Sequence, residues 1–136
     1  MRLGRYMTWR GFVAGAIVVV AGLLLRGPIR AKPASIEGGK PFRVEVLNGS
    51  GVRRAGQGLA EALRARGFDV VDIRNADRMD YAETLVLDRV GEPKYADAVA
   101  RELGVQSSYR QRNEDLLLEV TVILGRDLAS HYGEGS

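Results

Sequence analysis

The sequence predicts a small mixed α/β domain that follows an N-terminal membrane helix, and three observations lead to this prediction. Uncharged residues run without interruption from Gly11 to Leu25. Beyond residue 42, stretches with apolar residues at every second position, typical of strands, alternate with stretches of helical spacing. Gly67 and Gly104 follow the two helical stretches, where helices commonly end. These patterns favour a two-layer fold with two helices on one face of a mixed sheet.

Residues 11–26 are predicted to form a single transmembrane helix. Fifteen uncharged residues rise about 22 Å as a helix, short of the roughly 30 Å hydrocarbon layer. A start at Tyr6 adds length, because the Arg10 side chain can extend to the headgroups. A cleaved signal peptide and a core helix are the alternatives. The absence of a small-x-small motif directly after Leu25 favours an uncleaved anchor.

Orientation follows from the short basic tail at residues 1–10, which we expect to be cytoplasmic. Three arginines precede the apolar stretch and three basic residues follow it, so the positive-inside bias is nearly balanced. A short tail and a long C-terminal part still favour an inside N-terminus. We therefore expect a single-pass protein of the cytoplasmic membrane with an extracytoplasmic C-terminal domain, and the opposite orientation stays open.

Composition divides the remaining chain. Residues 27–41 hold three of the four prolines and predict a flexible linker, residues 42–128 predict the α/β domain, and residues 129–136 predict a disordered tail.

Beyond residue 35 there are 14 basic and 17 acidic residues, a net charge of −3. This charge disfavours nucleic-acid binding. The absence of cysteine excludes disulfides and thiol chemistry.

The spacing of apolar residues within 42–128 predicts the element order β-α-β-β-α-β-β. Strands are expected around 42–46, 68–73, 84–88, 106–111 and 116–125, and helices around 52–66 and 93–103. The fourth strand has the weakest pattern. One face of the last strand carries Leu116, Leu118, Val120, Val122 and Leu124.

The second face of the sheet also carries apolar side chains in this prediction. They are Leu47, Val71, Ile73, Val86 and Ile123. Such a face is either an exposed partner surface or is covered by the linker and loops.

The glycine-rich turn after the first strand is the best candidate for a binding site. Its glycine spacing fits neither a dinucleotide fingerprint nor a P-loop, since Arg54 stands where the former needs glycine and no GK[ST] follows. Free amides and two arginines there could hold an anion or a partner. The candidate residues are Asn48, Gly49, Ser50, Gly51, Arg53 and Arg54. Alternatively, Asn48 or Ser50 caps the helix and the glycines only supply turn geometry.

Other chemistry has little support. Asp69, Asp72, Asp77 and Asp80 lack the spacing of a calcium loop and are expected to be solvated, so no metal site is predicted. His131 lies in the glycine-rich tail, which argues against hydrolase chemistry. We expect neither a catalytic residue nor a cofactor, and the chain is not predicted to be an enzyme.

Several short motifs, in their order and spacing, resemble the LytR C-terminal domain family over residues 42–128. These are V-x-V-L-N-G-S-G at 44–51, R-G-F at 66–68, N-A-D at 75–77, Tyr81 with Thr84, and V-x-L-G-x-D at 122–127. The resemblance implies a bacterial cell-envelope protein with a small α/β domain that faces outward from the cytoplasmic membrane. The family's separate glycopolymer-transfer domain has no counterpart between the predicted anchor and this module.

We therefore expect a non-catalytic binding or scaffolding module whose partners are envelope-assembly enzymes or wall glycopolymers. One alternative is a cytoplasm-facing, membrane-bound regulatory protein similar to a transcriptional attenuator, which the balanced charges keep open. Another is an enzyme that acts on phosphorylated glycan.

Overall fold

The computed structural model describes residues 41–105 and 108–133. These residues belong to the unit Ala31–Ser136. The predicted transmembrane helix at 11–26 lies outside the described residues. Within the ranges that are described, no helix has the length and apolar character needed to cross a membrane.

The described residues form five strands, three α-helices and a short 3-10 helix. In chain order they are β1 (Arg43–Asn48), α2 (Ala55–Ala65), β2 (Asp69–Asn75), β3 (Leu85–Asp88), α3 (Pro93–Leu103), β4 (Ser108–Arg110), η1 (Glu114–Leu116), β5 (Val120–Leu124) and α4 (Arg126–Ala129). The predicted order of strands and long helices is confirmed, with η1 added before β5 and α4 added at the end.

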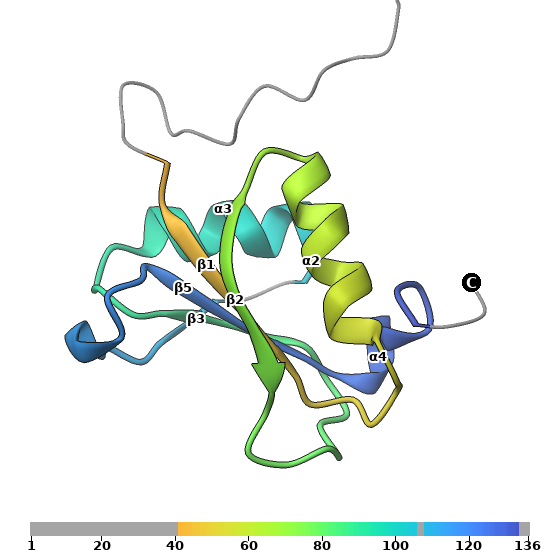
Figure 1. Cartoon of the computed structure of the whole chain (residues 1–136). Helices are drawn as coiled ribbons and strands as arrows, with labels where there is room; N and C mark the ends of the chain where they lie inside the picture. The colour runs from red at the N-terminus through yellow and green to blue at the C-terminus, as the bar shows by residue number, and fades with distance from the viewer. Residues whose placement is uncertain (1–40, 106–107, 134–136) are drawn as a thin grey trace, which may run out of the picture. The chain divides into compact units, whose positions relative to one another are not determined.

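The strands form one mixed sheet in the order β2-β1-β5-β3-β4. β1 lies in parallel between β2 and β5, whereas β3 is antiparallel to β5 and parallel to β4. β1, the first strand of the module, is therefore flanked on both sides by strands that run the same way (Figure 1). The turns that follow β1 and β5 consequently lie next to each other at one edge of the sheet.

Both long helices cover the same face of the sheet. The strand residues of this face, Val44, Val46, Val120 and Val122, are fully buried in one hydrophobic cluster. α2 supplies Leu59 and Leu63 to that cluster, and α3 supplies its Ala96, Val99 and Ala100. The helical spacing seen in the sequence therefore arises from one shared core.

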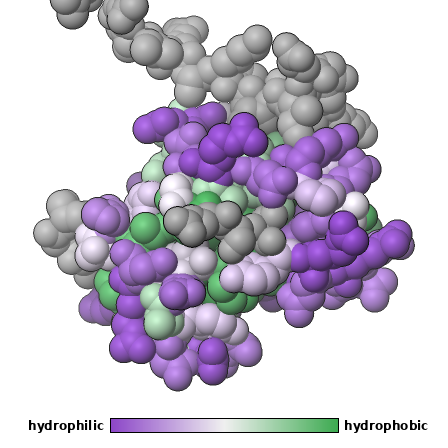
Figure 2. Space-filling view, turned by 180° about the vertical axis from the view of Figure 1, so that it is seen from behind, coloured by the Kyte–Doolittle hydropathy of each residue, from purple (hydrophilic) through white to green (hydrophobic). Residues whose placement is uncertain are grey.

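Two of the five apolar residues that the sequence analysis assigned to the opposite face of the sheet do not lie there. Ile73 and Val86 pair with Val46 and Val122 and so belong to the helix-covered face. An irregularity in the β1–β2 register shifts Ile73 to that face. On the side of the molecule seen in Figure 2, apolar residues lie in small patches separated by hydrophilic side chains.

A chain of polar side chains crosses the face away from the helices. Glu45 is only 2% exposed, and its carboxylate is bonded to Arg74 and accepts a hydrogen bond of 2.9 Å from the Thr121 hydroxyl. Thr121 in turn accepts a bond of 2.9 Å from Arg89 Nε. Burial lowers the pKa of Arg89. A buried carboxylate with these donors is compatible with the fold.

The last strand is shorter than predicted. It spans Val120–Leu124, while Leu116 belongs to η1 and Leu117 adopts the left-handed conformation with φ 53°. Leu117 is 71% exposed, so the run of three leucines does not continue the strand. Within the predicted tail, Ala129 is fully buried and Tyr132 packs against the core. The described part of that tail, 129–133, therefore belongs to the packed domain.

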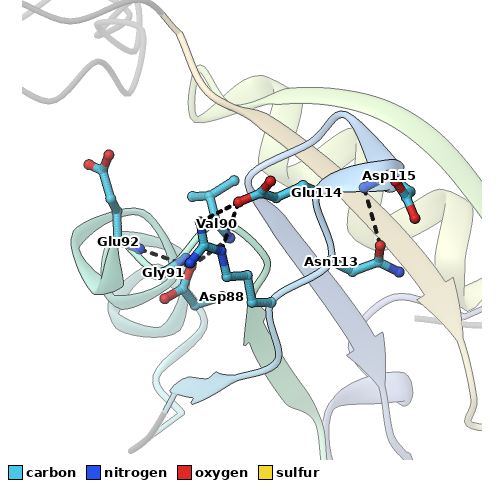
Figure 3. A network of polar contacts seen from close by, with 8 residues as sticks. Asp88, Val90, Gly91, Glu92, Asn113, Glu114 and Asp115 are labelled. Atoms are coloured by element: carbon cyan, nitrogen blue, oxygen red, sulfur yellow. Dashed lines mark hydrogen bonds and ion pairs between the residues drawn. The ribbon is translucent and has the colours of Figure 1, made fainter.

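The turn between β3 and α3 is organised by Asp88. One of its carboxylate oxygens accepts hydrogen bonds from the backbone N–H groups of Val90, Gly91 and Glu92, at 3.0, 2.8 and 3.2 Å (Figure 3). The carboxylate thus satisfies amides at the start of α3, where a negative charge is also favourable.

Candidate functional site

The candidate site lies at the edge of the sheet where β1 and β5 end. Three connections meet there: the turn from β1 to α2, the β2–β3 loop and the start of α4. Gly49 N–H donates to the Leu124 carbonyl at 2.9 Å, and Tyr81 N–H donates to the Gly49 carbonyl at 2.9 Å. Arg126 N–H then donates to the Tyr81 carbonyl at 2.9 Å. The backbone therefore joins the three connections directly.

The polar side chains of the glycine turn form hydrogen bonds within the turn itself. Asn48 Nδ2 donates to the Val52 carbonyl at 2.9 Å. Asn48 Oδ1 accepts from the Ser50 hydroxyl at 2.7 Å and the Ser50 N–H at 3.2 Å, and Val52 N–H donates to Ser50 Oγ at 3.1 Å. Both side chains are buried. The amides of Gly49, Ser50 and Val52 are thus already donors to protein acceptors.

Neither Asn48 nor Ser50 caps α2, so that part of the sequence interpretation is wrong. The residue before the helix is Arg54, which has a left-handed conformation with φ 60° and makes no side-chain capping bond. Asn48 and Ser50 instead fix the turn, as Asn and Ser side chains commonly do.

Gly49 is required by close packing. A Cβ at this position would lie 2.5 Å from Tyr81 Cδ2 and 3.1 Å from Ile123 Cγ2. A methyl group therefore cannot be accommodated without moving the aromatic ring. Gly51 has a different requirement, because its φ of 76° lies in the left-handed region that favours glycine.

A second set of hydrogen bonds joins Thr84 to Asp127, 43 residues apart in the sequence. The Thr84 hydroxyl and N–H donate to the two Asp127 oxygens at 2.7 and 3.0 Å. The same hydroxyl accepts from the buried Gly125 N–H at 3.1 Å. Leu128 N–H also donates to Asp127, at 2.8 Å. We call this set, formed by Thr84, Gly125, Asp127 and Leu128, the Thr84–Asp127 lock.

Exposed charged side chains and the partly exposed Tyr81 ring lie next to these residues in the chain. Arg53 and Arg54 have exposed side chains beside the turn. The Arg78 guanidinium stacks 4.5 Å from the centre of the Tyr81 ring. The Tyr81 hydroxyl donates to Asp77 Oδ1 at 2.8 Å, and this hydrogen bond raises the pKa of Tyr81 above its ordinary value. We call Arg53, Arg54, Arg78 and Tyr81 the arginine rim.

The structure therefore separates the six residues predicted from the sequence into two groups. Asn48, Gly49, Ser50 and Gly51 shape the turn, and Arg53 and Arg54 face solvent. An anion at this turn would have to be held by the two arginine side chains and by amides other than those of Gly49, Ser50 and Val52.

Sequence reasoning missed the pairing of Thr84 with Asp127, although both residues lie in motifs that it singled out. Among residues 41–105 and 108–133, no group of three acidic or histidine side chains is arranged to hold a metal ion. His131 is exposed, and its ring lies against Tyr132.

A family model described as LytR cell envelope-related transcriptional attenuator matches residues 42–128. The chain belongs to this family. Its domain is thus a cell-envelope-related LytR C-terminal domain. No curated protein and no solved structure matches the chain.

In this LytR C-terminal domain, four of the five motif stretches, 44–51, 75–77, 81–84 and 122–127, meet where β1 and β5 end. The stretch 44–51 contacts 122–127 through Gly49 and Leu124, and the stretch containing Tyr81 and Thr84 contacts both. Because the polar atoms of these motifs bond to one another, their first role is to fix the fold. Of the arginine rim, Tyr81 belongs to one of these motifs and carries the stacked Arg78 guanidinium.

Proposed function

We propose that this LytR C-terminal domain is a non-catalytic binding or scaffolding module of a membrane-anchored protein. In this proposal the domain lies outside the cytoplasm and binds envelope-assembly enzymes or wall glycopolymers through Arg53 and Arg54. The membership in a cell-envelope-related family supports the setting. The membrane anchor rests on the apolar stretch 11–26.

The proposal rests on a difference in exposure between the buried side chains of the motifs and the two arginines beside them. Asn48, Ser50 and Thr84 are 4–6% exposed and hydrogen-bonded internally, so they offer little to a substrate. Arg53 and Arg54 are exposed, and they follow a turn whose backbone is hydrogen-bonded to β5 and to the β2–β3 loop. Guanidinium groups on a rigid support suit recognition of phosphate or carboxylate groups on a glycopolymer or protein partner.

Co-sedimentation of the full-length protein, in detergent, with isolated cell walls tests this proposal. The variant Arg53→Ala/Arg54→Asn removes both guanidiniums, and asparagine at 54 tolerates the left-handed backbone. Each exposed ion pair contributes up to about 1 kcal/mol, so the double variant is expected to bind roughly five- to twentyfold more weakly. The difference is expected to shrink at high salt.

The matched control is Arg101→Ala/Arg110→Ala, which removes the same charge from exposed residues on α3 and β4. It should bind as the wild type does. Equal binding by both double variants would refute the arginine contact. If wild-type protein neither sediments with walls nor retains envelope proteins, the binding role itself is refuted. Turnover of phosphorylated glycan by the purified chain would contradict the non-catalytic role.

A further inference from the structure

A cleft of about 390 Å³ opens between the residues before β3, the end of α3 and α4. Its volume falls in the range of small-molecule sites. The lining residues come from four segments of the chain and are Glu83, Thr84, Gly104, Val105, Tyr109, Asp127 and Leu128. The cleft is lined by none of the residues of the arginine rim.

The lining of the cleft carries negative charge. Among the seven described residues that line it, Glu83 and Asp127 are charged and none is basic. The Glu83 side chain is exposed and makes no hydrogen bond or ion pair with another described residue. Gly104 and Val105 follow the C-terminus of α3, where the helix dipole adds partial negative charge. An anion would be repelled here, and a cation would be attracted.

The remaining wall offers apolar and aromatic surface. Val105 and Leu128 are partly buried and pack against the core, so they form a fixed apolar floor. Tyr109 is 49% exposed on the edge strand β4. An aromatic face can contact an aliphatic or sugar body and also attracts a cation.

The lock keeps one of the two carboxylates in position. Asp127 is held by two bonds from Thr84 and one from Leu128 N–H, so its orientation toward the cleft is fixed. Its Oδ2 atom accepts one of these bonds, from Thr84 N–H, and retains capacity for another donor. Glu83 lies one residue before Thr84, and its exposed side chain can change conformation. This pair can accept hydrogen bonds from an ammonium group.

We propose that this cleft binds a primary ammonium group carried on a small aliphatic or hydroxylated body. An amino sugar with a free amine and the side-chain amine of a peptide share this chemistry. The ammonium hydrogen-bonds to Glu83 and Asp127, and the body lies against Tyr109, Val105 and Leu128. The site is separate from the arginine rim, so an experiment can refute the proposal for one of them without refuting the proposal for the other.

Amide chemical shifts of the full-length protein in detergent micelles, measured during titration, test this assignment. The probes are glucosamine and Nα-acetyl-lysine amide, which carry the ammonium on a sugar and on an aliphatic chain. N-acetylglucosamine is the neutral comparison. Saturable shifts at Gly104, Val105 and Leu128 with either ammonium probe support the site, and the stronger probe identifies the source of the amine.

The variant Glu83→Gln removes one charge with almost no change of shape. It is expected to weaken binding of the ammonium probes roughly two- to fivefold, because the pair is open to solvent. Glu61→Gln makes the same change at an exposed position on α2 and should leave binding unchanged. The proposal is overturned if neither ammonium probe shifts these amides, if N-acetylglucosamine binds as tightly, or if Glu83→Gln and Glu61→Gln behave alike.

Discussion

Thr84→Val removes the hydroxyl group at the centre of the Thr84–Asp127 lock while keeping the volume of the side chain. In the wild type this hydroxyl donates to Asp127 at 2.7 Å and accepts from Gly125 N–H at 3.1 Å. Gly125 is buried, so its N–H has no access to water once the hydroxyl is gone. Asp127 is exposed and can replace the lost donor by a water molecule.

The expected loss of stability follows from these two contacts. A buried N–H without a partner costs about 1–3 kcal/mol. A hydrogen bond to a charged acceptor contributes about 1.5–3 kcal/mol, of which water at the exposed Asp127 returns a part. We therefore expect Thr84→Val to lower the free energy of unfolding by about 2–4 kcal/mol. For a domain of this size, the midpoint temperature should fall by roughly 10–20 °C.

Thermal unfolding of the unit Ala31–Ser136, followed by circular dichroism, measures this loss. Thr84→Ser keeps the hydroxyl and is the matched control, with an expected loss below about 1 kcal/mol. In a double-mutant cycle with Asp127→Ala, the coupling energy should reach about 1 kcal/mol or more. If valine is tolerated as well as serine, the lock does not stabilise the junction of the motifs and the reasoning is wrong.

Three further substitutions test other parts of the fold. Gly125→Ala should destabilise the domain by about 2 kcal/mol or more, since the new Cβ meets the backbone of the β2–β3 loop; denaturant unfolding measures it. Thr121→Val should cost about 1–2 kcal/mol in the same assay, because the buried Glu45 carboxylate loses a donor. Asp77→Asn should lower the pKa of Tyr81 toward its ordinary value, as followed by NMR of the ring. In the wild type the hydrogen bond from Tyr81 to Asp77 stabilises the fold below a pH of about 10, and its contribution is lost as the tyrosine ionises.

Local spacing was sufficient to predict the two long helices, α2 and α3, and that they share one face of the sheet. In α2, Leu59 and Leu63 are one turn apart, and both are buried where the helix packs on β1 and β2. In β1, Val44 and Val46 alternate with charged Glu45, so the face covered by the helices was unambiguous, although Glu45 is buried as well. These predictions held because each depends on residues within one element.

Features set by contacts between elements were not predictable in this way. In β3 the run Leu85-Val86-Leu87 is apolar at every position, so alternation could not say that Val86 faces the helices; its pairing with Val122 decides this. Leu117 ends an apolar run in a left-handed conformation that no spacing signals.

The candidate site shows the same division. The sequence identified the glycine turn and its arginines, but a turn sequence alone does not reveal which polar atoms are already bonded. Asn48 and Ser50 have their partners within the turn, whereas Thr84 finds Asp127 43 residues away. Only the meeting of β1, β3 and β5 brings these groups together.

The most direct test of the proposed role is the side of the membrane on which the domain lies. A C-terminal tag on the full-length protein can be exposed to protease in intact spheroplasts and, in parallel, in lysed cells. If the domain lies outside the cytoplasm, the tag is degraded in intact spheroplasts, which leaves wall glycopolymers and envelope enzymes as accessible partners. Protection of the tag until lysis would place the domain in the cytoplasm and contradict the proposed function.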